Sequence, residues 1–448
     1  MATPAVWASI QDHARHRPES VALRFTDGSM TYEELVAAVN AAVPGASPDD
    51  VHVVRADRGG RAVVEVLAAQ TFPRPALLVP HDAGAGYTAR IGRELRSFAD
   101  GPLRSRDAHG LWTTTSGSTG RPKIVAHDPG GIDRFVRWAR SRFALGADTV
   151  SLSLSPINFD IATLDVWAVL AAGGRVVFAP QEDLTNGAAL AAAARRHGVS
   201  LLQAVPVVLT LIAGARVPAP GVRTVVSTGD FYPLETLSDL ESAFPRADLW
   251  SVYGSTETND SFMVDLRRAT AGELGEPLDG VRYGIDGVGT GELVVSTPFQ
   301  ALGYVNAPND AWRTVEGRRE FRTGDLVTTD ADGTLRLTGR SDRQVKVRGV
   351  RLSLDAVEAV LRHQNGVADA VVTARGKESG DRELLAAVLV EPGAAVTNLA
   401  LRSAVSSALS PTAVPSRTFL TTEPFPVTGT GKTDRNSAIR RLLERQPT

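Results

Sequence analysis

TVSLSLSP (residues 149–156) and RVVFAP (175–180) enclose the helical pattern DIATLDVWAVLAAGG (160–174), and this alternation decides the fold class. The alternation continues downstream in GAALAAAARRHGV (187–199), VRTVVSTGD (222–230) and PLETLSDLESAF (233–244). Strands that alternate with helices in this way build βαβ units on a mainly parallel sheet. Upstream, GGIDRFVRWARSRFAL (130–145) carries apolar residues on one helical face, so we expect it to pack on that sheet.

The chain changes character after residue 285, where hairpin strands replace the alternation. These strands are GELVVST (291–297), DLVTTDADGTLRLTG (325–339), with Asp332-Gly333 as its turn, and QVKVRGVRLS (344–353). A small α+β unit follows, with helices over 354–366 and 399–410 and strands over 369–375 and 384–392. We predict an α/β fold: a large N-terminal domain (1–340) of mainly parallel sheets with flanking helices and a β-rich subdomain, then a small α+β C-terminal domain (341–448).

The composition is typical of a soluble globular protein, with 43% hydrophobic and 22% charged residues. No segment has the roughly 20 uninterrupted apolar residues of a membrane helix, and the N-terminus lacks a secretory pattern, so we expect a cytoplasmic protein without a membrane partner. The net charge of −2, with both signs interspersed, predicts no nucleic acid partner. The absence of cysteine excludes disulfides and a cysteine nucleophile, and the eight histidines form no HExxH-type metal pair.

TTTSGSTGRPK (113–123) crowds hydroxyls and glycines in front of two cations. It fails the Walker pattern GxxxxGK[ST], the dinucleotide pattern GxGxxG and the nucleophile pattern GxSxG. What remains is a loop whose glycines let the backbone approach a ligand and whose hydroxyls and N–H groups suit phosphate oxygens. Taken alone, such a run is more often a solvated turn.

Further motifs in the same order change that interpretation: YGSTETND (253–260), FRTGDL (321–326), GRSDRQVKVRGVRL (339–352) and PVTGTGKTDR (426–435). Together they resemble the adenylate-forming superfamily of acyl- and aryl-CoA synthetases, luciferases and nonribosomal peptide synthetase adenylation domains. The resemblance extends from VALRFTDGSMTYEELVAAVN (21–40) to Lys432. It implies an AMP-forming ligase that uses ATP and Mg²⁺ to activate a carboxylate as an acyl-AMP. Cations and oriented donors are needed because an anion attacks a polyanion.

The resemblance also assigns a nucleotide site. Tyr253 would stack on adenine, and Asp325, supported by Arg340, would accept the ribose hydroxyls. Thr256 would contact the α-phosphate and Glu257 would bind Mg²⁺, although a lone glutamate is equally typical of a surface. The other residues expected to bind ATP or AMP are Thr115, Ser116, Gly117, Ser118, Thr119, Gly120, Lys123 and Gly229.

Two residues near the ends of the C-terminal domain complete the expected machinery. Lys432 matches the family's catalytic lysine, which enters the active site on a mobile C-terminal domain and bridges the acyl carboxylate and the α-phosphate. Asp342 matches the hinge about which that domain rotates between half-reactions. The chain also departs from the family, because Ile124 replaces a glycine and Ser353 replaces an acid. The stretch between residues 36 and 113 is compressed, so the N-terminal subdomain is expected to be trimmed.

Asp160 in SPINFDIATLDVW (155–167) resembles the aspartate that pairs with the substrate ammonium in amino-acid-activating domains. A buried carboxylate needs a cation, and an ammonium would supply it. Alternatively, Asp160 caps the helix that follows. Asp260 either faces a polar substrate group or is solvated at the rim. The rest of the expected pocket comprises Ile161, Leu164, Gln203, Val226, Thr228, Val252 and Ser261, a lining that favours a small or medium-sized polar amino acid, including a β-amino acid.

We therefore predict a stand-alone amino-acid adenylating enzyme. Because the chain has no GGxS phosphopantetheine site, it would load a separate carrier protein. Competing hypotheses are an acyl- or aryl-CoA ligase with Asp160 as a helix cap, a ligase that passes the acyl group to a free amine, and a non-catalytic nucleotide-binding paralogue. Intact Lys432, Glu257 and Asp325 argue against the last.

Overall fold

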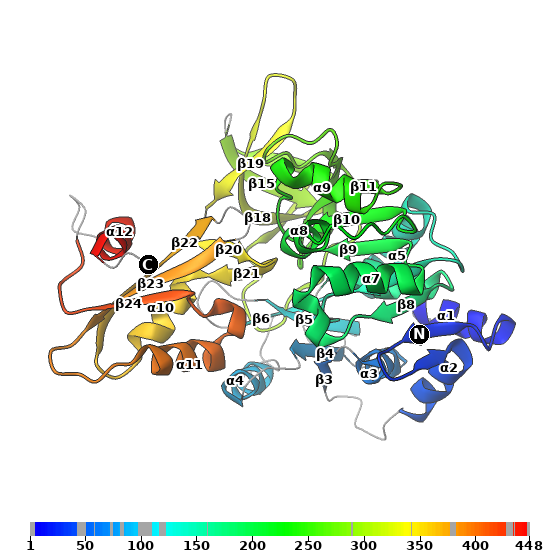
Figure 1. Cartoon of the computed structure of the whole chain (residues 1–448), viewed down its shortest axis with the longest axis horizontal. Helices are drawn as coiled ribbons and strands as arrows, with labels where there is room; N and C mark the ends of the chain where they lie inside the picture. The colour runs from blue at the N-terminus through cyan, green and yellow to red at the C-terminus, as the bar shows by residue number, and fades with distance from the viewer. Residues whose placement is uncertain are drawn as a thin grey trace. The chain divides into compact units, whose positions relative to one another are not determined.

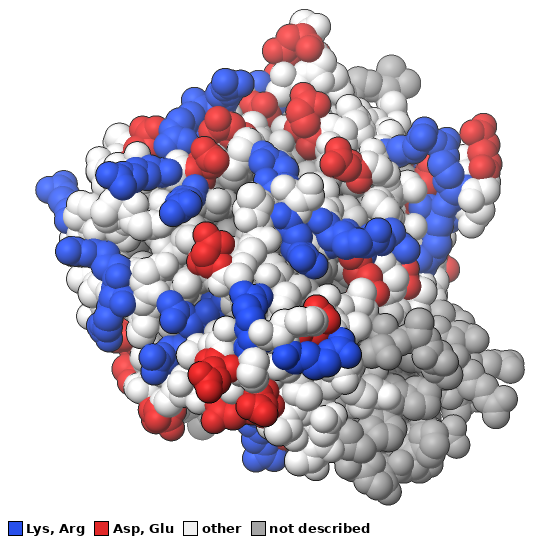
Figure 2. All heavy atoms as spheres, turned by 90° about the vertical axis from the view of Figure 1, so that its right-hand side faces the viewer, with Lys and Arg blue, Asp and Glu red and all other residues white. Residues whose placement is uncertain are grey.

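The computed structural model describes residues 5–42, 51–57, 59–71, 75–80, 85–96, 110–115, 122–158, 160–287, 290–341, 343–376, 382–426, 433 and 435–445. The chain divides into two compact units. Unit 1 comprises Met1–His81, Ser97–Thr114 and Ile124–Ser341, and unit 2 comprises Asp82–Arg96, Thr115–Lys123 and Asp342–Thr448. Within the described residues, no helix combines the length and apolar character that crossing a membrane requires. Basic side chains lie among acidic ones over the described part of the face in Figure 2.

A twisted, mainly parallel sheet forms the centre of unit 1, as the sequence predicts (Figure 1). Its strands run in the order β13 (Glu276–Pro277), β12 (Asn259–Asp265), β11 (Asp248–Ser255), β10 (Thr224–Thr228), β9 (Leu201–Ala204), β7 (Val150–Ser153), β8 (Arg175–Phe178), β1 (Val21–Arg24) and β2 (Ser29–Thr31). From β11 to β1 every neighbouring pair is parallel. β12, β13 and β2 are antiparallel additions at the two edges.

Helices cover both faces of this sheet because successive strand residues point to opposite sides. On one face, Leu202 and Val225 pack with α7 (Gly187–His197), α8 (Pro206–Gly214) and α9 (Leu237–Ala243). On the other face, Leu201 and Val226 share a core with α1 (Ala5–His16), α2 (Tyr32–Ala41), α3 (Gly60–Gln70), α5 (Pro129–Arg142) and α6 (Val169–Ala171). The expected packing of the 130–145 helix on the sheet is confirmed.

The order of the parallel strands creates a topological switch point. The chain passes from β7 to β8 on one side and then crosses back to β9 on the other side of β7. In open α/β sheets, ligands bind at the carboxyl ends of strands beside such a reversal. We therefore expect a ligand to bind among the loops that follow β7, β9, β10 and β11.

The helix predicted over residues 160–174 is only partly regular. Thr163–Ala168 form a π-helix before the short α6, so the expectation of an ordinary helix is wrong for these residues. The whole segment is buried. Because even Thr163 and Asp165 are buried here, the segment has no exposed face whose period could distinguish the wider turn. Ser151 of β7 donates its hydroxyl to the Asp165 carbonyl (2.5 Å) and thereby fixes the π-helix to the sheet.

Two smaller sheets complete unit 1. One runs in the order β16 (Gly303–Tyr304), β6 (Lys123–Ala126), β5 (Gly110–Thr115), β4 (Pro75–Pro80) and β3 (His52–Ala56). The other consists of β14 (Arg282–Asp286), β15 (Thr290–Ser296), β18 (Arg318–Thr329), β17 (Trp312–Val315) and β19 (Leu335–Arg340). The predicted turn between β18 and β19 is confirmed, with Gly333 at φ +89° and Asp330 bonded to Thr334.

Unit 2 has the expected small α+β organisation. β20 (Gln344–Val347) pairs with β21 (Val350–Ser353), and a second sheet joins β22 (Val367–Gly376), β23 (Arg382–Val390) and β24 (Arg417–Thr421). α10 (Leu354–Arg362) and α11 (Asn398–Ala408) pack on one face of that sheet, and α12 (Arg435–Arg445) packs on the other. The unit also includes α4 (Ala85–Arg96). Ser353, which replaces the family's acid, accepts the Ala356 N–H (3.2 Å) as the N-cap of α10.

Candidate active site

The expected substrate residues gather at the carboxyl ends of the parallel strands. Register places Gln203 of β9 opposite Val226 of β10, and Thr228 opposite Val252 of β11. All four are buried. Their alternation along the strands puts them on the face that also packs the π-helix residue Leu164. These side chains therefore share one face beside the switch point, where a ligand pocket is expected.

Asp160 lies in the loop between β7 and the π-helix. Its Oδ1 accepts the N–H of Ile161 (3.0 Å). The N-cap of the helical segment is Ala162, which makes no side-chain cap bond. The Asp160 carbonyl also accepts the Thr163 N–H (2.8 Å), so the first turn begins at this residue. Both predicted roles of Asp160, capping this helix and pairing with a substrate ammonium, stay predictions.

A β-bulge shapes the hairpin between β11 and β12. Tyr253 pairs with Phe262 and Gly254 pairs with Asp260, so Ser261 is the additional residue of the bulge. Bulges redirect side chains and are frequent next to active sites. Ser261 is fully buried, whereas Asp260 is half-buried. Thr256, in the tight turn of this hairpin, is also half-buried.

Tyr253, Asp325 and Arg340 form a connected group, although they are far apart in the sequence. The Tyr253 hydroxyl donates to Asp325 Oδ2 (2.5 Å), and the Arg340 guanidinium donates to Asp325 Oδ1. Asp325 of β18 lies directly opposite Arg340 of β19, so the antiparallel register creates this ion pair. The structure thus brings together the residues assigned to adenine and ribose.

Glu257 is anchored to the sheet that contains β5 and β6. Its side chain is buried, and Oε1 accepts the hydroxyl of Tyr304 (2.8 Å). Tyr304 belongs to β16, which pairs with β6 at Val125. Glu257 is therefore held beside the strand that follows the predicted phosphate loop. The sequence analysis did not identify Tyr304, since nothing in its local pattern signals a contact with a residue 47 positions upstream.

A buried histidine lies close to the same carboxylate. His127 follows β6, and its Nε2 is 2.8 Å from the hydroxyl oxygen of Thr113 on β5. Burial lowers the pKa of His127 from 6.5 to about 4, although the negative charge of Glu257 opposes this shift. The ring is therefore neutral near pH 7 and adds no positive charge there. His127 was also absent from the predicted site residues.

Several predicted residues lie outside the described part of the chain. These are Ser116, Gly117, Ser118, Thr119, Gly120, Asp342 and Lys432. Their flanking residues are described: Thr115 ends β5, and Lys123 begins β6. Gly229 directly follows β10 with φ +87°, a backbone conformation that side chains with a Cβ rarely adopt. The chain can therefore turn sharply at the carboxyl end of this strand.

The described residues suit a nucleotide with a magnesium ion. Asp325 offers carboxylate oxygens, the acceptors that two ribose hydroxyls require. Among the described residues, no group of three or more His, Cys, Asp or Glu side chains could hold a metal alone. Mg²⁺ needs no such group, because it binds through one or two carboxylates together with substrate phosphates and water. Glu257, whose orientation Tyr304 fixes, fits that mode.

Comparison with known proteins agrees with this geometry. The sequence pattern of the AMP-binding enzyme family matches residues 46–305, and that of the AMP-binding enzyme C-terminal domain matches residues 356–432. The chain belongs to the AMP-binding enzyme family. The predicted superfamily and fold class are confirmed.

Curated relatives of this AMP-binding enzyme include two proteins from Streptomyces. The L-proline--[L-prolyl-carrier protein] ligase of Streptomyces coelicolor is 32% identical over 339 residues, which cover 71% of this chain and 64% of that protein. The phosphinothricin tripeptide synthetase PhsB of Streptomyces viridochromogenes is 30% identical over 508 residues, 98% of this chain and 42% of that protein. This chain thus spans less than two thirds of either relative.

Solved structures resemble the chain over nearly its whole length. The o-succinylbenzoate CoA synthetase of Bacillus subtilis has a TM-score of 0.82 at 19% identity, covering 97% of this chain and 98% of that one. PA1221, a nonribosomal peptide synthetase protein containing adenylation and carrier (PCP) domains, has a TM-score of 0.81 at 24% identity, covering 98% and 84%. At these identities the likeness shows the shared fold.

Proposed function

We propose that this chain is an AMP-forming ligase that activates an amino acid and transfers it to the phosphopantetheine thiol of a separate carrier protein. The observation that carries the proposal is the Tyr253–Asp325–Arg340 group, which brings together three residues assigned to the nucleoside. It lies in the unit that also holds the pocket face beside the switch point. The name of the L-proline--[L-prolyl-carrier protein] ligase supports an amino acid as the class of substrate and a carrier protein as the acceptor.

In the first step, a carboxylate oxygen of the amino acid attacks the α-phosphorus of ATP, and pyrophosphate leaves. Tyr253 and Asp325 orient the nucleoside, and Thr256 donates to the α-phosphate. The loop from Thr115 to Gly120, with Lys123, holds the β- and γ-phosphates. Glu257 would hold Mg²⁺, which would offset phosphate charge, and Lys432 bridges the two reacting anions.

In the second step, the carrier's thiolate attacks the acyl carbonyl, and AMP leaves with the electrons of the broken bond. The chain itself has no cysteine, so the thiol comes from the partner. We assign residues 1–340 to the adenylation core and residues 341–448 to a lid domain. Asp342 is the hinge that lets the lid serve both steps.

The substrate ammonium is assigned to Asp160, which lies in the loop after β7 at the carboxyl edge of the parallel sheet. Asp160, Ile161 and Leu164 form one side of the proposed pocket. The strand residues Gln203, Val226, Thr228 and Val252 form another, and the hairpin contributes Asp260 and Ser261. This mixture of apolar and polar side chains favours a small or medium-sized polar amino acid.

Amino-acid-dependent ATP–pyrophosphate exchange tests the proposal, because it reports activation before any acceptor is needed. Asp160→Asn is expected to lower kcat/KM for the preferred amino acid about 10-fold or more, the effect of losing one charge-assisted hydrogen bond. Asp148→Asn, a matched change of an exposed aspartate in unit 1, should leave exchange unchanged.

Two results would contradict the proposal. If no amino acid supports exchange but a non-amino acid gives CoA-dependent release of AMP, the chain is an acyl- or aryl-CoA ligase. If AMP release instead requires a free amine and yields an amide, it is an amide-forming ligase. In both cases Asp160→Asn would leave activity close to that of the wild-type chain.

A further inference from the structure

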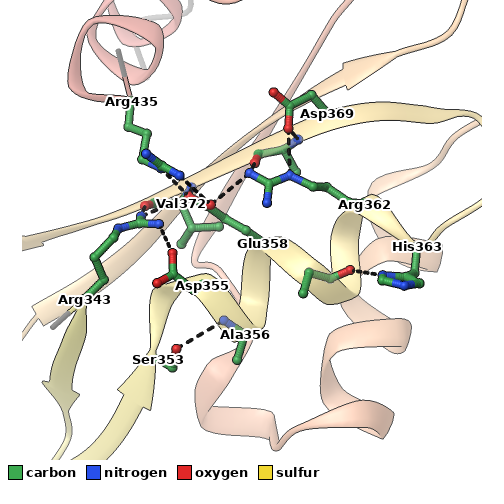
Figure 3. Close-up of polar contacts among 12 residues, drawn as sticks. Arg343, Ser353, Asp355, Ala356, Glu358, Arg362, His363, Asp369, Val372 and Arg435 are labelled. Atoms are coloured by element: carbon green, nitrogen blue, oxygen red, sulfur yellow. Dashed lines mark hydrogen bonds and ion pairs between the residues drawn. The ribbon is translucent and has the colours of Figure 1, made fainter. Parts of the chain in front are cut away.

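A buried carboxylate occupies the centre of an ion-pair network in unit 2. Glu358 of α10 is 0% exposed, and arginine side chains approach it from several directions (Figure 3). Oε1 accepts hydrogen bonds from Arg343 (2.9 Å), Arg435 (3.0 Å) and the Val372 N–H (2.9 Å). Oε2 accepts from Arg362 (2.9 Å) and from Arg435 (3.3 Å). Arg435 thus binds both oxygens.

Neighbouring acids balance the charge of this network. Arg343 also donates to Asp355, and Arg362 also donates to Asp369 (2.7 Å). Burial alone would raise the pKa of Glu358, but the hydrogen bonds from Arg343, Arg435 and Val372 outweigh it and lower the pKa below its ordinary value. Glu358 is therefore ionised at neutral pH. A buried ion pair of this kind depends strongly on each partner, since loss of one leaves an uncompensated charge.

The arginines come from functionally different parts of the chain. Arg343 directly follows Asp342, the proposed hinge, and Arg435 begins α12, three residues after Lys432, the proposed catalytic lysine. Arg362, in contrast, lies on the same helix as Glu358. Glu358 of α10 therefore binds both Arg343, at the start of the segment Asp342–Thr448, and Arg435, at the start of α12.

The ion pair acts on the first turn of α12, whereas apolar packing holds the later turns. The apolar packing of α12 against the sheet of unit 2 involves Ala438, Ile439 and Leu442. Loss of the Arg435 pair should thus loosen the first turn without detaching the helix. Covalent geometry limits Lys432 to about 11 Å from the Arg435 Cα, so disorder at Arg435 is transmitted to the lysine.

We propose that Glu358 and Arg435 are positioning residues for Lys432. Their bidentate pair fixes the point from which the lysine-bearing segment extends, and so determines how often the ammonium reaches the geometry that adenylation requires. The inference rests on the proposed function, because it takes Lys432 as the adenylation lysine. It goes further by naming two residues that contact neither nucleotide nor acid.

A pair of matched variants separates positioning from general stability. Arg435→Gln and Arg362→Gln each remove one arginine from Glu358, and the two side chains are similarly exposed, at 37% and 39%. Arg435→Gln is expected to lower kcat of ATP–pyrophosphate exchange about 10-fold or more, with the KM values of ATP and acid within about 3-fold. Glu358→Gln should behave in the same way. Arg362→Gln should keep kcat within about 3-fold of wild type. Equal kcat in the two arginine variants would overturn the inference.

Amide hydrogen exchange gives a second measurement that does not depend on activity. Arg435→Gln should accelerate hydrogen exchange at the amides of residues 439–441, whose helical acceptors are the carbonyls of the first turn of α12, but not at those of β24. Arg362→Gln should leave residues 439–441 protected. Unchanged amide hydrogen exchange in Arg435→Gln would show that the Glu358–Arg435 pair does not fix the start of α12, even if the enzyme is active. A wild-type chain that activates no amino acid refutes the proposed function. Even then, faster amide hydrogen exchange in Arg435→Gln would support the role of the Glu358–Arg435 pair in fixing the start of α12.

Discussion

Replacing His127 with asparagine is expected to reduce the pH dependence of the free energy of unfolding of unit 1. The buried ring has a pKa of about 4 in the folded chain, compared with 6.5 when exposed. Above pH 6.5 the ring is neutral in both states and the full stability is present. As the pH falls from 6.5 toward 4, the unfolded chain binds a proton that the folded chain does not, so stability is lost.

The size of this effect follows from the two pKa values. At 1.36 kcal/mol per pH unit, the interval between 6.5 and about 4 corresponds to about 3 kcal/mol when the transition is complete. Between pH 7.5 and pH 5, where fewer carboxylates titrate, the contribution of His127 is about 2 kcal/mol. The wild-type chain should lose this amount over that range, and His127→Asn should not.

Urea unfolding followed by tryptophan fluorescence measures the effect in the correct unit, since all six tryptophans precede residue 341. His16→Asn, which changes an exposed histidine of α1, is the matched control and should retain the wild-type pH dependence. The comparison concerns the difference between pH 7.5 and pH 5, so a general loss of stability in His127→Asn does not affect it. An identical pH dependence in wild type and His127→Asn would refute the buried, neutral histidine.

Two further predictions concern the chemistry. Lys432→Ala should lower the rate of adenylation at least about 100-fold, the usual effect of removing one oriented transition-state donor, in ATP–pyrophosphate exchange; near-normal formation of aminoacyl-AMP would exclude this lysine. Tyr253→Phe removes the hydroxyl that donates to Asp325 and should raise the KM of ATP about 10-fold while the KM of the amino acid stays within about 2-fold. Steady-state kinetics with each substrate varied separately measures both values, and an unchanged KM of ATP would show that the hydroxyl does not orient Asp325.

The parts of the fold that the sequence predicts are those in which local pattern and tertiary environment agree. β10 (TVVST) is rich in β-branched residues, with Val225 and Val226 on opposite faces that are both covered by helices, so it is recognisable as a buried parallel strand. Asp332 and Gly333 specify a turn through their own backbone preferences. The motif positions at strand ends could be predicted for a related reason, since parallel strands align their carboxyl ends.

Other features depend on contacts between distant segments and leave no local signal. The hydroxyl of Tyr304 reaches Glu257 because β16 pairs with β6, a pairing that no motif encodes. Glu358 looks like an ordinary glutamate in the helical pattern 354–366, yet it is completely buried by arginines from elsewhere in the chain. The π-helix was missed because all its residues are buried, so no exposed face reveals the period.

The two carboxylates of unit 1 differ in a way that fits their proposed ligands. Each accepts a tyrosine hydroxyl: Glu257 from Tyr304 and Asp325 from Tyr253. A hydroxyl fixes the orientation of a carboxylate without cancelling its charge. Asp325 also pairs with Arg340, which offsets its charge and leaves an acceptor suited to neutral ribose hydroxyls. Glu257 lies near His127, which burial keeps neutral. The histidine therefore does not offset the negative charge of Glu257, and this charge suits a cation. Protonation of His127 would weaken that preference, which links the acid sensitivity of unit 1 to the proposed Mg²⁺ site.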